Sequence, residues 1–106
     1  MTDVRQAALE YAHQNNERFL NELKEFLAIP SISTSPEYKP DVQRAAEWVA
    51  EQLRSLDMEN VQIMPTGGHP AVYGEQFKAG KDAPTVLIYG HYDIRPVDPL
   101  QGGSPR

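Results

Sequence analysis

Cysteine is absent from the 106 residues of this chain. Its absence excludes a disulfide-stabilised scaffold, a thiolate metal site and a cysteine nucleophile. The sequence also predicts no secretory signal, because residues 1–18 are polar where such a signal needs an apolar run. No stretch approaches the roughly 20 apolar residues of a membrane span. These absences favour a protein of a reducing compartment, and we expect a cytoplasmic location without membrane association.

Basic residues are few, with 10 Lys and Arg against 15 Asp and Glu, and the formal net charge is −5. An acidic chain without a basic block is not expected to bind nucleic acid. The sequence also lacks G-x-S-x-G, G-x-G-x-x-G and P-loop motifs, which leaves a serine hydrolase or a nucleotide-binding fold without support. What is present is a globular composition, with 40% hydrophobic residues in a chain of single-domain length.

The first helical pattern covers residues 4–28. Apolar residues recur there at three- and four-residue steps, which predicts one long helix. Pro30 cannot continue it and disfavours helical dihedrals at the preceding residue. Asn15 and Asn16 are weak helix formers in the middle of the run, so the pattern allows a kink or a split at that point.

The rest of the chain changes period. A loop rich in proline and serine, residues 30–40, precedes a second amphipathic helix over 42–56. Short strand-like runs at 61–64 and 71–77 predict a hairpin. The run 85–89 is apolar on both faces, as in strands buried between layers. We therefore expect an α/β fold in which two helices pack on a small sheet with 85–89 as its central strand.

His91 and Asp93 directly follow the run 85–89. In extended backbone, side chains two residues apart point the same way, so the imidazole and the carboxylate should lie side by side. Ligand sites of open α/β sheets lie at this carboxyl end of the strands. A carboxylate that accepts a hydrogen bond from one ring N–H leaves the lone pair of the other ring nitrogen free to bind a metal ion. The alternative is a His and an Asp that merely end a strand, because three-residue motifs recur by chance.

Four further residues receive structural interpretations. His69 lies in a Gly-Gly-His-Pro turn and is expected to be structural, and His13 on the first helix is expected to face solvent. Tyr92 should point away from His91 and pack against the fold. Asp98, which precedes a proline, favours a turn, and it also lies close enough to the H-x-D motif to remain a candidate for the site.

The longer run TVLIYGHYDIRPVDP at 85–99 resembles the first metal-site motif of the di-zinc exopeptidases, the family of carnosinase-like dipeptidases, aminoacylases and succinyl-diaminopimelate desuccinylases. It is most similar to the dipeptidase-like branch. Three upstream segments also resemble this family: FLAIPSIS at 26–33, AAEWV at 45–49 and GGHPAVYG at 67–74. The resemblance covers nearly the whole chain up to Leu100.

By position, this resemblance implies that His91 is a zinc ligand and that Asp93 is the catalytic-site carboxylate that orients it. It also implies two zinc ions in the intact enzyme and a peptide or N-acyl amino-acid substrate. Relatives form homodimers through a domain inserted later in the sequence. The family's remaining ligands and its glutamate base lie further along and have no counterpart here, so the zinc site is incomplete.

Residues 1–106 are accordingly expected to be the N-terminal part of a zinc peptidase catalytic domain, without the rest of that domain or the dimerisation domain. The last residues, 101–106, depart from the family pattern, and a truncation, a frameshifted reading and a deliberately shortened chain all remain open. We expect a metallo-dipeptidase by family and no hydrolysis by this segment alone. The alternative is a non-catalytic fragment that binds another chain through an exposed sheet edge or helix stripe.

Overall fold

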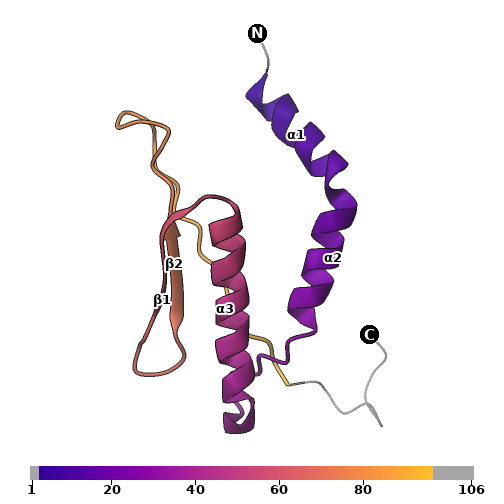
Figure 1. Ribbon diagram of the computed structural model, residues 1–106, viewed down its shortest axis with the longest axis vertical. Coiled ribbons are helices and arrows are strands. Elements are labelled where there is room, and N and C mark those ends of the chain that lie inside the picture. Colours follow the sequence, from indigo (N-terminus) through magenta and orange to yellow (C-terminus); the bar gives the residue numbers. More distant parts are fainter. Residues whose placement is uncertain (1–2, 97–106) are drawn as a thin grey trace.

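The computed structural model describes residues 3–96. Its elements, in chain order, are α1 (Val4–Gln14), α2 (Asn16–Leu27), the 3-10 helix η1 (Pro36–Tyr38), α3 (Lys39–Ser55), β1 (Glu59–Met64) and β2 (Ala71–Glu75). Figure 1 shows α3 between the hairpin on one side and the α1–α2 arm on the other. The expected α/β composition is confirmed. Within the described range, no helix has both the length and the apolarity needed to span a membrane.

Most of the buried apolar residues lie on α3, which contacts both strands of the hairpin, and Ile29 and Ile32 of the loop after α2 are buried as well. Apolar residues of α3 recur at helical spacing and therefore share one face of the helix. This face is completely covered, with exposed fractions of at most 1% for Val42, Ala45, Ala46 and Ala50. Most of these side chains are single methyl groups, which lets the strands approach the helix closely.

The β1–β2 hairpin is antiparallel, and its register sets Ile63 opposite Val72. The hairpin predicted from the sequence is therefore confirmed. Gly74 allows β2 to lie close against α3, because a Cβ atom at this position would lie 3.0 Å from Leu53 Cδ1. Together, α3 and the hairpin form a packed unit within the described residues.

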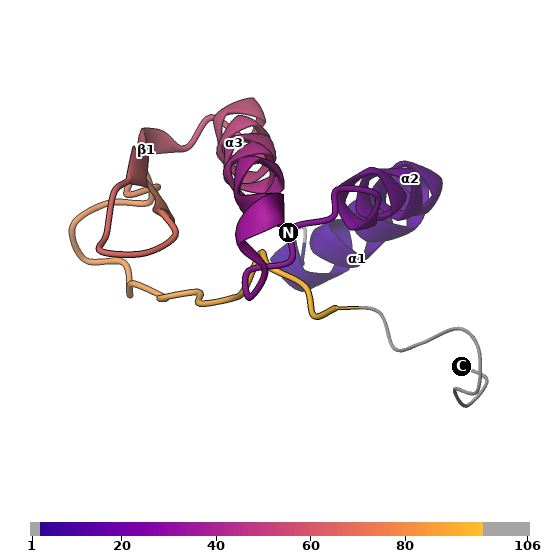
Figure 2. The ribbon, with the colours of Figure 1, turned by 90° about the horizontal axis from the view of Figure 1, so that it is seen from below.

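The predicted long first helix is split at Asn15, as its weak helix formers allowed. Asn15 leaves the helical region with φ −108° and ψ 11°, and its side-chain amide donates to Tyr11 O at 2.9 Å. The expectation that this first helix covers the sheet is wrong. Figures 1 and 2 both place α2 on the opposite side of α3 from the hairpin. Its contact with α3 is the stacking of Phe26 on Trp48, with ring centroids 5.0 Å apart.

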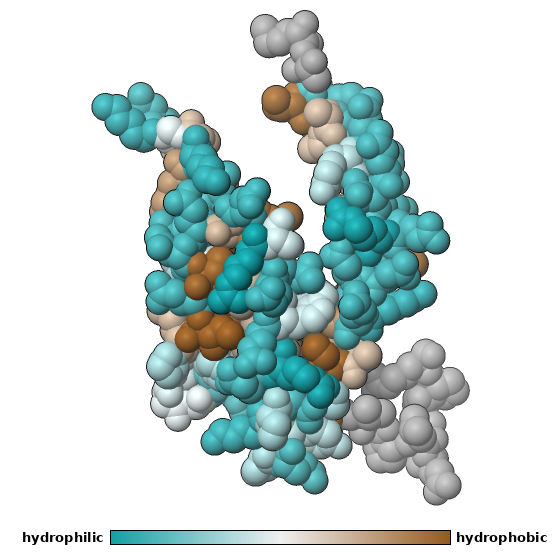
Figure 3. All heavy atoms as spheres, viewed as in Figure 1, coloured by the Kyte–Doolittle hydropathy of each residue, from teal (hydrophilic) through white to brown (hydrophobic). Residues whose placement is uncertain are grey.

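The α1–α2 arm makes the molecule extended. The radius of gyration is 17.4 Å, whereas a compact domain of 100 residues has about 13 Å. Neither α1 nor α2 contains a buried residue. On the face drawn in Figure 3, the middle of the arm is hydrophilic, and hydrophobic residues gather between the hairpin and α3.

Residues 85–89 do not form the buried central strand that their sequence predicts. They belong to no strand, and the side chains of Val86 to Tyr89 are 78% to 89% exposed. A strand is stabilised when neighbouring strands pair its backbone and other layers cover its faces. The hairpin and α3 bury their apolar faces against each other, and no other element of residues 3–96 covers this run.

Candidate functional site

The structure brings His91 and Asp93 side by side, as their spacing predicts. His91 Nδ1 lies 3.5 Å from Asp93 Oδ1, and the side chains are 72% and 37% exposed. On the other side of the ring, His91 Nε2 lies 3.3 Å from the hydroxyl oxygen of Tyr89. When Nδ1 carries the ring proton, Nε2 turns its lone pair toward this hydroxyl. A metal ion would use the same lone pair.

The second oxygen of Asp93 is held by Ser33, whose hydroxyl donates to Asp93 Oδ2 at 2.6 Å. This hydrogen bond is the largest cause of a lowered pKa for Asp93. Partial desolvation opposes the effect, and the neighbouring His91 adds to it. Asp93 is therefore a carboxylate at neutral pH, with one oxygen bonded to Ser33 and the other facing the imidazole.

The backbone around Asp93 is anchored to the loop that follows α2. Ile32 and Ile94 form an isolated parallel bridge. Ile94 N donates to Ser31 O at 3.0 Å, and Ser31 Oγ donates to Tyr92 O at 3.1 Å. Ser31 is only 1% exposed and Ile32 only 7% exposed. The chain that carries Asp93 is thus fixed from both sides of that residue.

Three of the four residues with structural interpretations lie within the described residues and behave as expected. His69 is half-buried, and its Nε2 lies 2.8 Å from Ser33 O. The hydroxyl of Tyr92 donates to Pro70 O, which ties this side chain to the turn between β1 and β2. His13 is exposed on α1.

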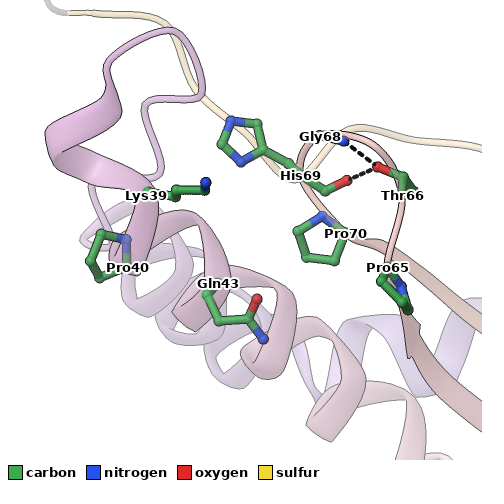
Figure 4. Close-up of a pocket in the computed structure, with 8 residues that line it drawn as sticks. All are labelled: Lys39, Pro40, Gln43, Pro65, Thr66, Gly68, His69 and Pro70. Atoms are coloured by element: carbon green, nitrogen blue, oxygen red, sulfur yellow. Dashed lines mark hydrogen bonds between the residues drawn. The ribbon is translucent and has the colours of Figure 1, made fainter.

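An open pocket of about 410 Å³ lies between the start of α3 and the turn that joins β1 to β2 (Figure 4). Within the turn, Thr66 Oγ1 accepts from Gly68 N and donates to His69 O. The lining residues are Lys39, Pro40, Gln43, Pro65, Thr66, Gly68, His69 and Pro70. His91 and Asp93 are not among them, so the H-x-D motif lies outside this pocket.

The described residues offer a metal ion one imidazole ligand and its orienting carboxylate. Residues 3–96 contain no group of three or more His, Cys, Asp or Glu side chains that could hold a metal ion. A catalytic zinc ion usually takes three protein ligands. The donor chemistry of His91 suits zinc, and the remaining ligands would have to come from outside the described residues. Asp98 also lies outside them.

Sequence reasoning did not assign a role to Ser31 or Ser33. Both lie in FLAIPSIS, which contributed to the family resemblance but contains no usual metal ligand. The contact of Ser33 with Asp93 joins residues 60 positions apart in the sequence. No local pattern signals such a contact, so the resemblance of the segment was the only available sign of its importance.

The chain is similar in sequence to curated proteins that are named as peptidases. The chain is 33% identical over 83 residues to a cysteinylglycine-S-conjugate dipeptidase of Corynebacterium striatum, across 78% of this chain and 18% of the relative. It is 28% identical over 91 residues to a Cys-Gly metallodipeptidase of Candida albicans, across 76% of this chain and 19% of the relative. A Cys-Gly metallodipeptidase of Schizosaccharomyces pombe is 27% identical over 105 residues, which are 90% of this chain and 22% of the relative.

The chain spans about a fifth of the length of these relatives. No protein-family model matches it, and no solved structure matches it significantly.

Proposed function

Because the chain belongs by sequence to the dipeptidase-like metallopeptidases, we propose that it carries the first metal-ligand motif of a zinc-dependent dipeptidase. His91 is the zinc ligand, and Asp93 is the catalytic-site carboxylate that orients it. In this proposal, residues 1–106 are the N-terminal part of the catalytic domain. The observation that carries the proposal is the approach of Asp93 Oδ1 to His91 Nδ1 at 3.5 Å.

The chain's own residues prepare the imidazole for ligation. The carboxylate of Asp93 favours the tautomer with the proton on Nδ1, which leaves the Nε2 lone pair available. Ligation through Nε2 requires the hydroxyl of Tyr89, now 3.3 Å away, to move aside. When bound in a peptidase, zinc would polarise the carbonyl of the scissile bond and lower the pKa of a bound water.

The reaction proposed for the intact enzyme is hydrolysis of a peptide or amide bond with a zinc-activated water. Two relatives are named for Cys-Gly and one for a cysteinylglycine conjugate, which supports a dipeptide substrate over an N-acyl amino acid. The proposal also includes two zinc ions, homodimerisation through a domain other than residues 1–106, and a cytoplasmic location.

The 106-residue chain is proposed to be inactive on its own. One imidazole holds a metal ion weakly and leaves most of its coordination sphere to water. Such an ion would not acidify its bound water to the extent reached in a catalytic site with three protein ligands.

The test combines Zn²⁺ binding with hydrolysis, using the 106-residue chain. Zn²⁺ is titrated while the ring resonances of the three histidines are followed by NMR. His91 should respond at the lowest Zn²⁺ concentration, and Asp93→Asn should weaken its affinity by about 10–100-fold. His91→Ala should abolish this response, whereas the matched control His13→Ala should leave it unchanged.

Equal responses of His91 and His13 would contradict the ligand assignment. The Zn²⁺-saturated chain should also leave Cys-Gly intact. Metal-dependent hydrolysis that persists through repeated purification would contradict the proposed inactivity and would demand a ligand set beyond His91.

A second candidate function is that of a protein-interaction fragment. The observation that favours it is the exposed apolar run Val86 to Tyr89, since exposed apolar strips recruit partners. Two results together would favour this candidate over the peptidase. His91 would show no response to Zn²⁺, and the chain would bind another protein saturably and lose that binding on Leu87→Lys.

A further inference from the structure

We propose that Ser33 is a positioning residue for the His91–Asp93 pair. Its own backbone carbonyl is held by a hydrogen bond from His69. The inference rests on the proposed function, because it assigns the support of the same motif. Its starting point is the 2.6 Å hydrogen bond from Ser33 Oγ to Asp93 Oδ2. Hydrogen bonds to an ionised carboxylate are short and about twice as strong as neutral ones, and 2.6 Å lies in their range.

The hydroxyl of Ser33 determines which way the carboxylate faces. Asp93 is an exposed side chain, and water alone would leave it several rotamers. With Oδ2 held by Ser33, the other oxygen lies 3.5 Å from His91 Nδ1. Ser33 thus acts on His91 through Asp93, without touching the imidazole.

Ser33 can hold Asp93 only if its own backbone is fixed. The bridge between Ile32 and Ile94 and the hydrogen bond from Ile94 N to Ser31 O join the segment before Ser33 to the segment that carries Asp93. Ser31 is buried and its hydroxyl donates to Tyr92 O. These contacts join the two residues before Ser33 to the residues on both sides of Asp93, which limits the distance between the backbones at positions 33 and 93.

His69 supports Ser33 from the turn between β1 and β2. Its Nε2 lies 2.8 Å from Ser33 O, and a carbonyl oxygen can only accept, so Nε2 carries the proton. The turn itself is held by Thr66, whose hydroxyl donates to His69 O. The loop after α2 thus binds the carboxylate directly through Ser33, and the hairpin turn supports that loop through His69.

A positioning role predicts lost orientation without lost folding. In Ser33→Ala, water can solvate the exposed Oδ2 of Asp93, so the fold should persist. The Asp93 side chain should then average over rotamers, which three-bond couplings report in the metal-free chain. Zn²⁺ affinity at His91 should fall by up to about tenfold, the lower end for residues that orient a ligand.

Two matched variants separate the hydroxyl from the local sequence. Ser33→Thr keeps a hydroxyl and should retain both the Asp93 couplings and the Zn²⁺ affinity. Thr34→Ala removes the neighbouring exposed hydroxyl and should change neither. His69→Ala should loosen Asp93 in the same direction as Ser33→Ala, because Ser33 O loses its partner.

The deciding measurement in the unsubstituted chain is the nuclear Overhauser effect between the β-protons of Ser33 and Asp93. Its absence overturns the proposal even where Ser33→Ala fails to fold. A folded Ser33→Ala chain with a single Asp93 rotamer and unchanged Zn²⁺ affinity also overturns it. If His91→Ala leaves Zn²⁺ binding unchanged, the proposed function fails, and the metal-free Asp93 couplings still decide whether Ser33 positions this carboxylate.

Discussion

The apolar face of α3 and the apolar run 85–89 have opposite environments in the structure. The α3 face is made mostly of alanine, and its residues, such as Ala45 and Ala46, are completely buried. The run Val86 to Tyr89 consists of larger hydrophobic side chains, and these are 78% to 89% exposed. Hydropathy alone would predict the opposite, with the larger side chains of Val86 to Tyr89 buried and the alanines of α3 more exposed.

The difference lies in the available partners. The hairpin covers the buried face of α3, and Gly74 lets the two surfaces meet closely. Residues 85–89 have no strand beside them and no layer above them in the described chain. Burial stabilises an element only in proportion to the apolar area that another element covers.

Hydrogen exchange should show the largest contrast between the two regions. Amides in the middle of α3 should exchange at least about a hundredfold more slowly than those of Val86 to Tyr89. The free energy of local opening is near zero for exposed segments and approaches the global free energy of unfolding for core helices. Residue-resolved exchange followed by NMR measures both at once. Comparable protection of Val86 to Tyr89 would mean that this run is covered in solution.

Shortening a buried apolar side chain should cost much more than shortening an exposed one. Val42→Ala removes two carbon atoms from a fully buried site, and should lower the free energy of unfolding by about 2 kcal/mol. Ile88→Ala, at an 88% exposed site, should stay within about 0.5 kcal/mol. Urea denaturation measures both, and equal losses would contradict the exposed position of Ile88.

The buried hydroxyl of Ser31 should contribute a smaller, local effect. Ser31→Ala removes the hydrogen bond to Tyr92 O, which is worth about 1 kcal/mol. The amide of Ile94 should then exchange about fivefold faster, since that hydrogen bond helps to hold the 31–33 and 92–94 segments together. The control is Ser35→Ala, because the Ser35 side chain makes no capping hydrogen bond to η1. An unchanged rate for Ile94 in Ser31→Ala would show that the backbone bonds alone hold this segment.

A charge within the exposed run should have the smallest effect on folding. Leu87→Lys should change the free energy of unfolding by no more than about 0.5 kcal/mol, because the side chain is already in solvent. It should also reduce self-association, since a lysine breaks a flat apolar strip. Sedimentation velocity measures the second effect. A large loss of stability would indicate that Leu87 packs against the fold.

Much of the local structure could be predicted because its causes are local. Helical periodicity placed α3 over 42–56, close to its observed range, and the weak helix formers marked the split at Asn15. Alternating patterns and the intervening turn predicted the hairpin. The two-residue spacing of His91 and Asp93 correctly predicted that their side chains lie together, although their roles remain proposals.

The sequence by itself determined the elements and the H-x-D juxtaposition, since both follow from backbone geometry over a few residues. Tertiary structure alone decided that α2 packs on the far side of α3, that 85–89 stays exposed and that Ser33 holds Asp93. The hydrogen bond between Ser33 and Asp93 joins positions 60 residues apart, and no periodicity extends over such a separation. These features depend on which surfaces meet when the chain folds, and that is a competition among all its apolar faces and hydrogen-bonding groups.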